Sequence, residues 1–205
     1  MCCSACRWDC CHDGEISGLI NMSKYSYYTD GAATMKQENG KYVREAGGWA
    51  FVLLIDGCED SIRFGGCPLT TNNEMELYAM YASMKDFLLK SQSGDIIEIF
   101  SDSAYCINIF TQWAEGWQKR GWKKSDNKPI QNLKIIKSIW DLMGEIRNNS
   151  CILNFIKVKG HSSNKYNDEA DKLAVDAKMD AFKTDKTTYF DENDGLLGKK
   201  SKYVD

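Results

Sequence analysis

Apolar and polar residues recur with two different periods along the chain, and these periods predict a mixed α/β domain. Alternating patterns or short apolar runs predict β-strands at residues 25–29, 49–55, 61–64, 96–100 and 151–158. A 3.6-residue period predicts helices at about 77–88, 130–143 and 167–182, and a further helix is expected to begin at Ser103. The expected order of elements is β-β-β-α-β-α-α-β-α, which is typical of a layered α/β fold.

Composition divides the 205 residues into three zones. Residues 1–22 are rich in cysteine without apolar periodicity, residues 23–182 contain all the predicted elements, and residues 183–205 have few apolar side chains. We expect a cysteine-rich lead, one globular domain and a flexible C-terminal tail. The longest apolar run, residues 49–55, is too short for a membrane span. Residues 1–11 lack the pattern of a secretory signal, so we expect a cytoplasmic protein without a membrane partner.

Five of the nine cysteines lie within residues 1–12. The run Cys3-x2-Cys6-x3-Cys10-Cys11-His12 offers enough soft ligands for one tetrahedral zinc ion. Its spacing matches no standard zinc motif, so an unstructured, oxidisable terminus is the favoured alternative. The odd number of cysteines, without a secretory signal, argues against a disulfide framework.

Overall charge does not predict a nucleic-acid partner, because 26 Lys and Arg residues face 29 Asp and Glu residues, for a formal net charge of −3. Locally, residues 113–128 contain five cations against two acids, interleaved with three tryptophans. Cations neutralise phosphates and aromatic faces pack against sugars or bases, so this segment is a candidate nucleic-acid contact. The alternative is a solvated helix with core tryptophans.

Five acidic residues occupy the ends of predicted strands or the starts of predicted helices: Asp30, Glu76, Asp102, Asp168 and Asp171. A favourable interaction with the helix dipole accounts for Glu76, Asp168 and Asp171 as structural residues, but it does not account for the other two. Strand carboxyl ends and helix N-termini line one crevice of an open α/β sheet, so these acids are expected to converge. Carboxylates without His or Cys ligands favour Mg²⁺ or Mn²⁺.

The segments around these acids resemble the signature segments of type 1 ribonuclease H, in the order found in that family. They are residues 28–31, 70–77, 101–105 and 158–171, and residues 111–123 resemble that family's basic protrusion. The resemblance covers residues 24–180. It implies the ribonuclease H-like α/β fold, a five-stranded mixed sheet flanked by helices, in which the first three strands are antiparallel.

The resemblance implies an endoribonuclease that hydrolyses the RNA strand of RNA/DNA hybrids with two Mg²⁺ ions, for which Mn²⁺ can substitute. The products would carry 5′-phosphate and 3′-hydroxyl ends. It assigns metal binding to Asp30, Glu76, Asp102 and Asp171. It gives His161 a part in proton transfer or product release, and Asp168 an auxiliary part. Two alternatives stay open: another nuclease or recombinase of the same fold, and a hybrid-binding protein without catalysis.

We expect a monomer, although the sequence itself does not determine the oligomeric state. The resemblance suggests where a hybrid would be bound. Tyr105 and Trp117 would line a channel for the DNA strand, while Asn72 and Asn73 would reach the minor groove. Further contacts would come from the protrusion, namely from Lys119, Arg120, Trp122, Lys123 and Lys124.

Two more positions match a family pocket for a DNA phosphate, Thr71 and Asn132. Leu69 stands where that pocket often has an arginine, so the phosphate grip is expected to be weaker or differently built. The polar segment at 35–45 is longer than the resemblance leads us to expect, and its effect stays open.

Overall fold

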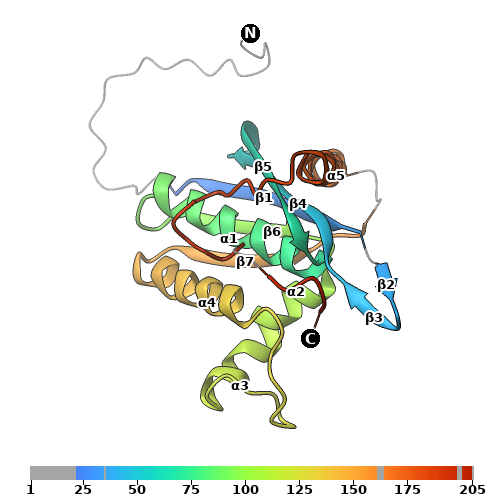
Figure 1. Ribbon diagram of the computed structural model, residues 1–205. Coiled ribbons are helices and arrows are strands. Elements are labelled where there is room, and N and C mark those ends of the chain that lie inside the picture. Colours follow the sequence, from blue (N-terminus) through green and yellow to red (C-terminus); the bar gives the residue numbers. More distant parts are fainter. Residues whose placement is uncertain (1–21, 35, 161–163, 198–199, 205) are drawn as a thin grey trace, which may run out of the picture.

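A five-stranded mixed sheet forms the centre of the molecule (Figure 1). The computed structural model describes residues 22–34, 36–160, 164–197 and 200–204. Along the sheet the strands lie in the order β5 (Cys58–Thr70), β4 (Glu45–Ile55), β1 (Lys24–Ala33), β6 (Ile96–Ser101) and β7 (Ile152–Lys157). Strand β1 pairs antiparallel with β4 and parallel with β6, and β4 pairs antiparallel with β5. The predicted fold class is confirmed.

Helices cover both faces of the sheet, because alternate residues of β4 point to opposite sides. Trp49, Phe51 and Leu53 belong to one core cluster with residues of α1 (Asn72–Lys90) and α4 (Leu133–Asn148). Val52 and Leu54 belong to a second cluster with residues of α5 (Lys165–Thr184). None of the helices in the described ranges is long and apolar enough to cross a bilayer.

One bent helical run leaves the sheet and leads into the predicted basic protrusion at residues 111–123 (Figure 1). It consists of α2 (Ala104–Asn108), a π-helical turn η1 (Ile109–Trp113) and α3 (Ala114–Lys119). The chain then returns to α4, which begins at Leu133 rather than at the predicted residue 130. Asn132 precedes this helix in the left-handed conformation, with φ of 57°, so the helix cannot extend further toward Pro129.

The polar segment at 35–45 contains a hairpin that the hydrophobic pattern did not predict. Strands β2 (Lys36–Glu38) and β3 (Lys41–Val43) pair antiparallel. They are joined by Asn39 and Gly40, whose φ angles of 52° and 77° suit the tight turn of a β-hairpin. Both strands are largely exposed, so neither shows the apolar alternation of a half-buried strand.

The expectation of a flexible tail after residue 182 is wrong for most of that segment. Helix α5 continues to Thr184, and residues 186–197 and 200–204, here called the C-terminal strap, lie back across the molecule (Figure 1). Thr188 donates its N–H to the Gly66 carbonyl at 2.8 Å, and its own carbonyl accepts from Trp49 Nε1 at 3.1 Å. Leu196 and Leu197 are buried in the larger core cluster. Although the strap has few apolar side chains, these hold it in place because they pack into the core.

Candidate active site

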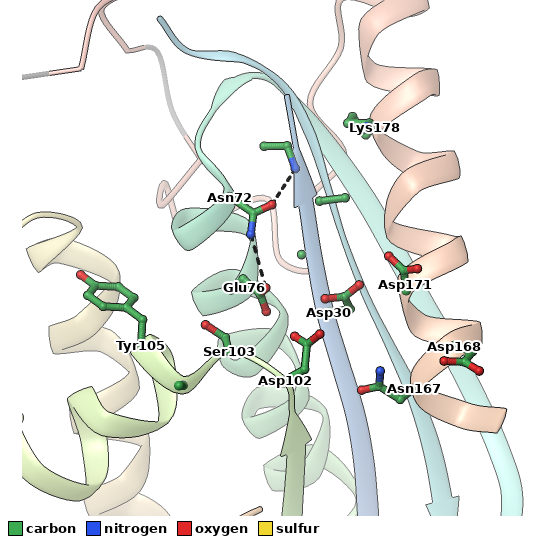
Figure 2. Close-up of a pocket in the computed structure, with 14 residues that line it drawn as sticks. Asp30, Asn72, Glu76, Asp102, Ser103, Tyr105, Asn167, Asp168, Asp171 and Lys178 are labelled. Carbon is green, nitrogen blue, oxygen red and sulfur yellow. Dashed lines mark hydrogen bonds between the residues drawn. The ribbon is translucent and has the colours of Figure 1, made fainter. Parts of the chain in front are cut away.

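Three carboxylates from separate parts of the chain meet at one edge of the sheet. Asp30 lies near the end of β1, and Asp102 directly follows β6, its parallel neighbour. Glu76 projects from the second turn of α1. Carboxylate oxygens of these three residues lie within 4.8 Å of one another, and Figure 2 shows the side chains pointing toward a common centre. The predicted convergence is therefore present for these three acids.

Gly31 allows α1 to approach β1 closely enough for this cluster. A Cβ atom at Gly31 would lie 2.1 Å from the Glu76 nitrogen and 2.4 Å from the Met75 carbonyl carbon. Both are backbone atoms of the helix, which cannot move aside as a flexible side chain can. The absence of a side chain at residue 31 thus brings Asp30 and Glu76 together.

The start of α1 is fixed by side chains that also shape the site. The Thr71 hydroxyl caps the helix by accepting from the Glu74 N–H at 3.4 Å. Asn72 accepts from the Ala33 N–H at 3.0 Å and donates to Glu76 Oε1 at 3.5 Å, as Figure 2 shows. Asn72 therefore ties β1 to α1 and orients the Glu76 carboxylate.

Helix α5 contributes the opposite wall of the same cavity, which has a volume of about 470 Å³. Asp168 and Asp171 line it, as does Asn167, on the other side of Asp30 in Figure 2. Asp171 lies outside the 4.8 Å cluster of three, but its negative charge contributes to the raised pKa of Asp30. The structure thus brings all five predicted acids to one cavity, with three of them tightly packed.

The cavity holds its acids in an environment that disfavours negative charge. Burial and, after it, the nearby charge of Asp102 raise the pKa of Asp30, and the hydrogen bond from the Gly31 N–H lowers it; together these effects bring the pKa to about 8. Burial also raises the pKa of Glu76, followed by the charge of Asp30. The positive charge of Lys157 acts in the opposite direction on Glu76. A bound cation would relieve this repulsion.

The donor atoms fit a divalent oxygen-seeking cation. Every ligand in the cluster is a carboxylate oxygen, the donor type that Mg²⁺ and Mn²⁺ prefer. Glu76 Oε2 is buried and has no hydrogen-bond partner among the described residues. An unsatisfied buried carboxylate oxygen is costly, and a metal ion would satisfy it. His161 and the N-terminal cysteines lie outside the described residues.

A second cavity of about 840 Å³ adjoins the first, and Asn72 lines both. The predicted substrate-binding residues Thr71, Asn73, Lys124 and Asn132 line it together. Thr71 and Asn132, for which a phosphate contact was predicted, thus line one recess, and Leu69 is not among its lining residues.

The aromatic residues of the protrusion pack mainly on one another. Trp117 is only 9% exposed and lies 5.9 Å from Trp113, which in turn lies 6.1 Å from Tyr105 (centroid distances). Trp122 packs on Trp140 at 6.1 Å. Trp117 therefore offers a substrate little area, and much of the predicted aromatic pattern serves packing. Tyr105 lines the carboxylate cavity.

The predicted protrusion cations lie at its surface. Lys119, Arg120 and Lys123 are exposed, whereas Lys124 is half-buried at the second cavity. Lys119 forms an ion pair with Glu115 at 2.5 Å, which reduces the charge that it offers to a phosphate.

The sequence analysis missed three polar residues that line the carboxylate cavity: Ser103, Asn167 and Lys178. Asn167 is 3% exposed, and its Oδ1 has no hydrogen-bond partner among the described residues. Ser103 and Asn167 are each adjacent in sequence to a predicted acid, Asp102 or Asp168, whereas Lys178 is not. That adjacency at the start of a helix was the available signal.

Comparisons with known proteins agree with this architecture. The RNase H family model matches residues 22–179. The chain is 38% identical to a ribonuclease H of Acetivibrio thermocellus over 156 residues, which cover 76% of this chain and 95% of that protein. It is 39% identical to a ribonuclease H of Clostridium botulinum over 163 residues, which cover 78% and 99%.

Solved structures show the same fold at low sequence identity. One is the crystal structure of LC9-RNase H1, described as a type 1 RNase H with the type 2 active-site motif. It has a TM-score of 0.62 and 20% identity, and the match covers 92% of this chain and 91% of that one. The PFV RNase H domain has a TM-score of 0.61 and 18% identity, with 79% and 98% covered. From the family match and these relatives, the chain belongs to the ribonuclease H family, as its signature segments predicted.

Proposed function

We propose that this ribonuclease H cleaves the RNA strand of RNA/DNA hybrids at the cavity bounded by Asp30, Glu76, Asp102 and Asp171. The supporting observation is the meeting of three carboxylates within 4.8 Å, in surroundings that raise the pKa of two of them. Such a cluster is unfavourable for binding a polyanion by itself, and this argues against a hybrid-binding protein without catalysis.

Two Mg²⁺ ions would be held by these four acids, and Mn²⁺ suits the same oxygen donors. Asp30 lies between the other acids in Figure 2 and would contribute to both ions. Asp102 and Asp171 would complete one site and Glu76 the other. When bound, the ions would supply the positive charge that activates water and stabilises the leaving 3′ oxygen, which gives 5′-phosphate and 3′-hydroxyl ends.

The chain's own residues would position the RNA strand at these acids. Asn72 orients Glu76 through its hydrogen bond, which leaves the buried Oε2 to face its ligand. Glu76 would also accept from a ribose 2′-hydroxyl, the group that distinguishes RNA from DNA. Asn167 presents a buried acceptor to the same cavity. His161 is assigned product release or proton transfer.

The complementary strand would extend from Asn72 and Asn73 toward the second cavity, with Thr71 and Asn132 contacting a phosphate. Tyr105, with the small exposed face of Trp117, would flank its path. The surface cations of the protrusion would add contacts to more distant phosphates: Lys119, Arg120, Lys123 and Lys124. Trp122 packs under this surface and would hold it in place.

A cleavage assay with an isosteric variant tests this function. Wild-type protein should cut a labelled RNA/DNA hybrid only with Mg²⁺, and should leave RNA and DNA duplexes intact. Asp102→Asn keeps the shape but removes one ligand charge, so it should lose at least ~100-fold of the activity. Its affinity for the hybrid and its folding should persist.

The matched control is Asp176→Asn, the same change at an exposed position of α5. It should cleave as the wild type does. Near-normal cleavage by Asp102→Asn, or cleavage of the hybrid without a divalent ion, would contradict the proposed site.

A further inference from the structure

The second cavity is enclosed by parts of the chain far apart in sequence. Its lining comes from the β2–β3 hairpin and the residues after it, from the start of α1, from residues 128–132 and from Val204 of the C-terminal strap. Among the described residues that line it are three cations and no carboxylate: Arg44, Lys124 and Lys128. Lys128 is paired with Asp126 at 2.9 Å, so Arg44 and Lys124 supply most of the free charge. A cavity with this lining favours an anion.

Arg44 is held in this cavity by the backbone of the strap. Its Nη1 donates to the carbonyl of Ser201 at 3.0 Å and also to the carbonyl of Tyr203. Carbonyls are neutral, and Arg44 has no ion pair within the described residues, so its positive charge is uncompensated. Its Nε is buried and has no hydrogen-bond partner among the residues that the structure describes. Because Nε is buried, it is the positive charge of the guanidinium, rather than this donor, that is available to an anionic ligand.

The strap fixes this arrangement through an isolated β-bridge to the hairpin. Val43 pairs antiparallel with Tyr203, Arg44 donates its N–H to the Lys202 carbonyl at 2.8 Å, and Val204 donates to the Tyr42 carbonyl at 3.0 Å. These contacts place the backbone on both sides of Arg44, so the guanidinium cannot move away without breaking them.

A buried ion pair ties the strap to the start of α1. Lys200 Nζ lies 2.5 Å from Glu74 Oε1, with both side chains largely buried. Glu74 also accepts from the Thr70 hydroxyl at 2.9 Å. The strap is thereby anchored at Glu74, two residues from Asn72, the residue that the two cavities share.

Strand register places Arg44 beside the residues already assigned to substrate. Glu45 pairs with Thr70 across β4 and β5, so Arg44 lies opposite the end of β5, where Thr71 begins the path into α1. Leu69, two residues from Thr71, provides no charge. Arg44, which lies between β3 and β4, thus supplies a cation beside β5, where Leu69 provides none.

We propose that Arg44, held by the carbonyls of Ser201 and Tyr203, binds a backbone phosphate of the hybrid in the second cavity. The ligand is a nucleic-acid phosphodiester, from the strand that continues past Asn72. This inference rests on the proposed function. It assigns a role to the 36–44 hairpin and to the strap, neither of which contacts the carboxylate cluster.

Binding measurements with Arg44→Gln test the proposal. The affinity for a labelled RNA/DNA hybrid is measured without divalent ions across a salt series, and cleavage is measured in single turnovers at saturating enzyme with Mg²⁺. Arg44→Gln should raise Kd about 5–10-fold and reduce the slope of log Kd against log salt by about 0.9, the effect of one lost phosphate contact. Its single-turnover rate should stay within about twofold of wild type, because the contact is distant from the reacting bond.

Arg63→Gln is the matched control. Arg63 is exposed in the middle of β5 and lines neither cavity, so the same loss of charge there should leave Kd and salt slope unchanged. Removal of residues 200–205 should reproduce the effect of Arg44→Gln, and adding Arg44→Gln to that truncation should cause little further loss, because the two act through one contact. Full additivity would overturn the role given to the strap.

Hybrids with a single neutral methylphosphonate identify the phosphate and its strand. One position on either the DNA or the RNA strand should weaken wild-type binding as Arg44→Gln does, and should leave binding by Arg44→Gln unchanged. If wild type cleaves the hybrid while Arg44→Gln keeps the wild-type salt slope, the proposal for Arg44 fails and the proposed function stands. If wild type neither binds nor cleaves hybrids, the proposed function itself fails.

Discussion

Asp30 is the residue on which the electrostatics of the site depend. It lies on the central strand, is 8% exposed, and faces Glu76 and Asp102. In the unfolded chain its carboxyl is surrounded by water, whereas in the fold burial and the charges of Asp102 and Asp171 together raise its pKa to about 8. The folded protein therefore binds a proton at Asp30 more tightly than the unfolded chain over the range from about pH 4 to about pH 8.

This difference predicts the direction of a pH effect on stability. Because the folded state holds the extra proton, the metal-free protein should lose stability as pH rises from about 4 to about 8. Divalent ions bind the ionised carboxylates, so Mg²⁺ should raise Tm more at pH 8 than at pH 5, by at least about 4 °C. Thermal unfolding in EDTA and in Mg²⁺ measures both effects.

The Asp102→Asn variant is the internal reference for this experiment. It removes the second cause of the raised Asp30 pKa, so its decline in stability with pH in EDTA should be shallower. An Mg²⁺-induced change in Tm that is the same at both pH values would count against a metal site at these carboxylates.

Among the elements, β1 and α1 have the contact that matters most for the site. Their close approach at Gly31 is between backbones, and it sets the separation of Asp30 and Glu76. A second glycine, Gly48, likewise allows α5 to pack closely on β4, because a Cβ at this position would lie 2.1 Å from the Ala174 carbonyl oxygen. The helices that carry the acids thus lie closer to the sheet than side chains would allow.

Gly31→Ala should therefore damage both stability and cleavage. Forcing α1 away from β1 should cost about 1–3 kcal/mol of the free energy of unfolding, as overpacking does. A shift of about 1 Å between Asp30 and Glu76 should reduce the cleavage rate by roughly 100-fold. Urea unfolding and single-turnover cleavage measure the two losses.

Gly144→Ala provides the comparison within a helix. A Cβ at Gly144 in α4 would meet no atom within 4 Å, so alanine should stabilise the protein by up to about 1 kcal/mol and leave cleavage unchanged. Equal effects of the two substitutions would show that the close approach at Gly31 is not needed.

Elements with a strong hydrophobic period were predicted from the sequence, and so was the position of the acids at strand and helix ends. Helix α4 is an example, since its buried residues recur on one face: Ile135, Ile136, Ile139, Leu142, Met143 and Ile146. The β2–β3 hairpin was not predicted, because its side chains are largely exposed and its strands have only three residues each. The role of Arg44 was not predicted either. Its side chain is held by a hydrogen bond to the carbonyl of Tyr203, which is nearly 160 residues away in sequence, and no local pattern reveals such a contact.

At the scale of the whole molecule, the C-terminal strap completes the core. Phe190 packs against Trp49 and Phe51, and Tyr78 donates to Asp194 at 2.6 Å while accepting from the Phe190 N–H. The strap's polar composition led us to expect a tail. Its apolar residues come in pairs, Tyr189-Phe190 and Leu196-Leu197, which are too short to show a period.

Truncating one strap residue should show how much stability it adds. Leu197 is 1% exposed, so Leu197→Ala should lower the free energy of unfolding by about 2–5 kcal/mol. Leu89, which is 77% exposed on α1, is the matched position, and Leu89→Ala should stay within about 0.5 kcal/mol of wild type. The two variants are compared by urea unfolding. A similar urea midpoint for both variants would indicate that residues 186–197 add little stability and behave as a free tail.

The shared core of Tyr25 and Leu197 has a consequence for the timing of synthesis. A ribosome adding about 5–20 residues per second makes β1 on the order of ten seconds or more before it makes Leu197. Throughout that interval the nascent chain lacks the side chains that cover Trp49, and its apolar surface is open to other chains. The two hydrogen bonds that hold the Arg44 side chain form later still, because the ribosome adds Ser201 and Tyr203 after Leu197. In the growing protein, the carboxylate cluster can therefore assemble before the cavity beside it has its final shape.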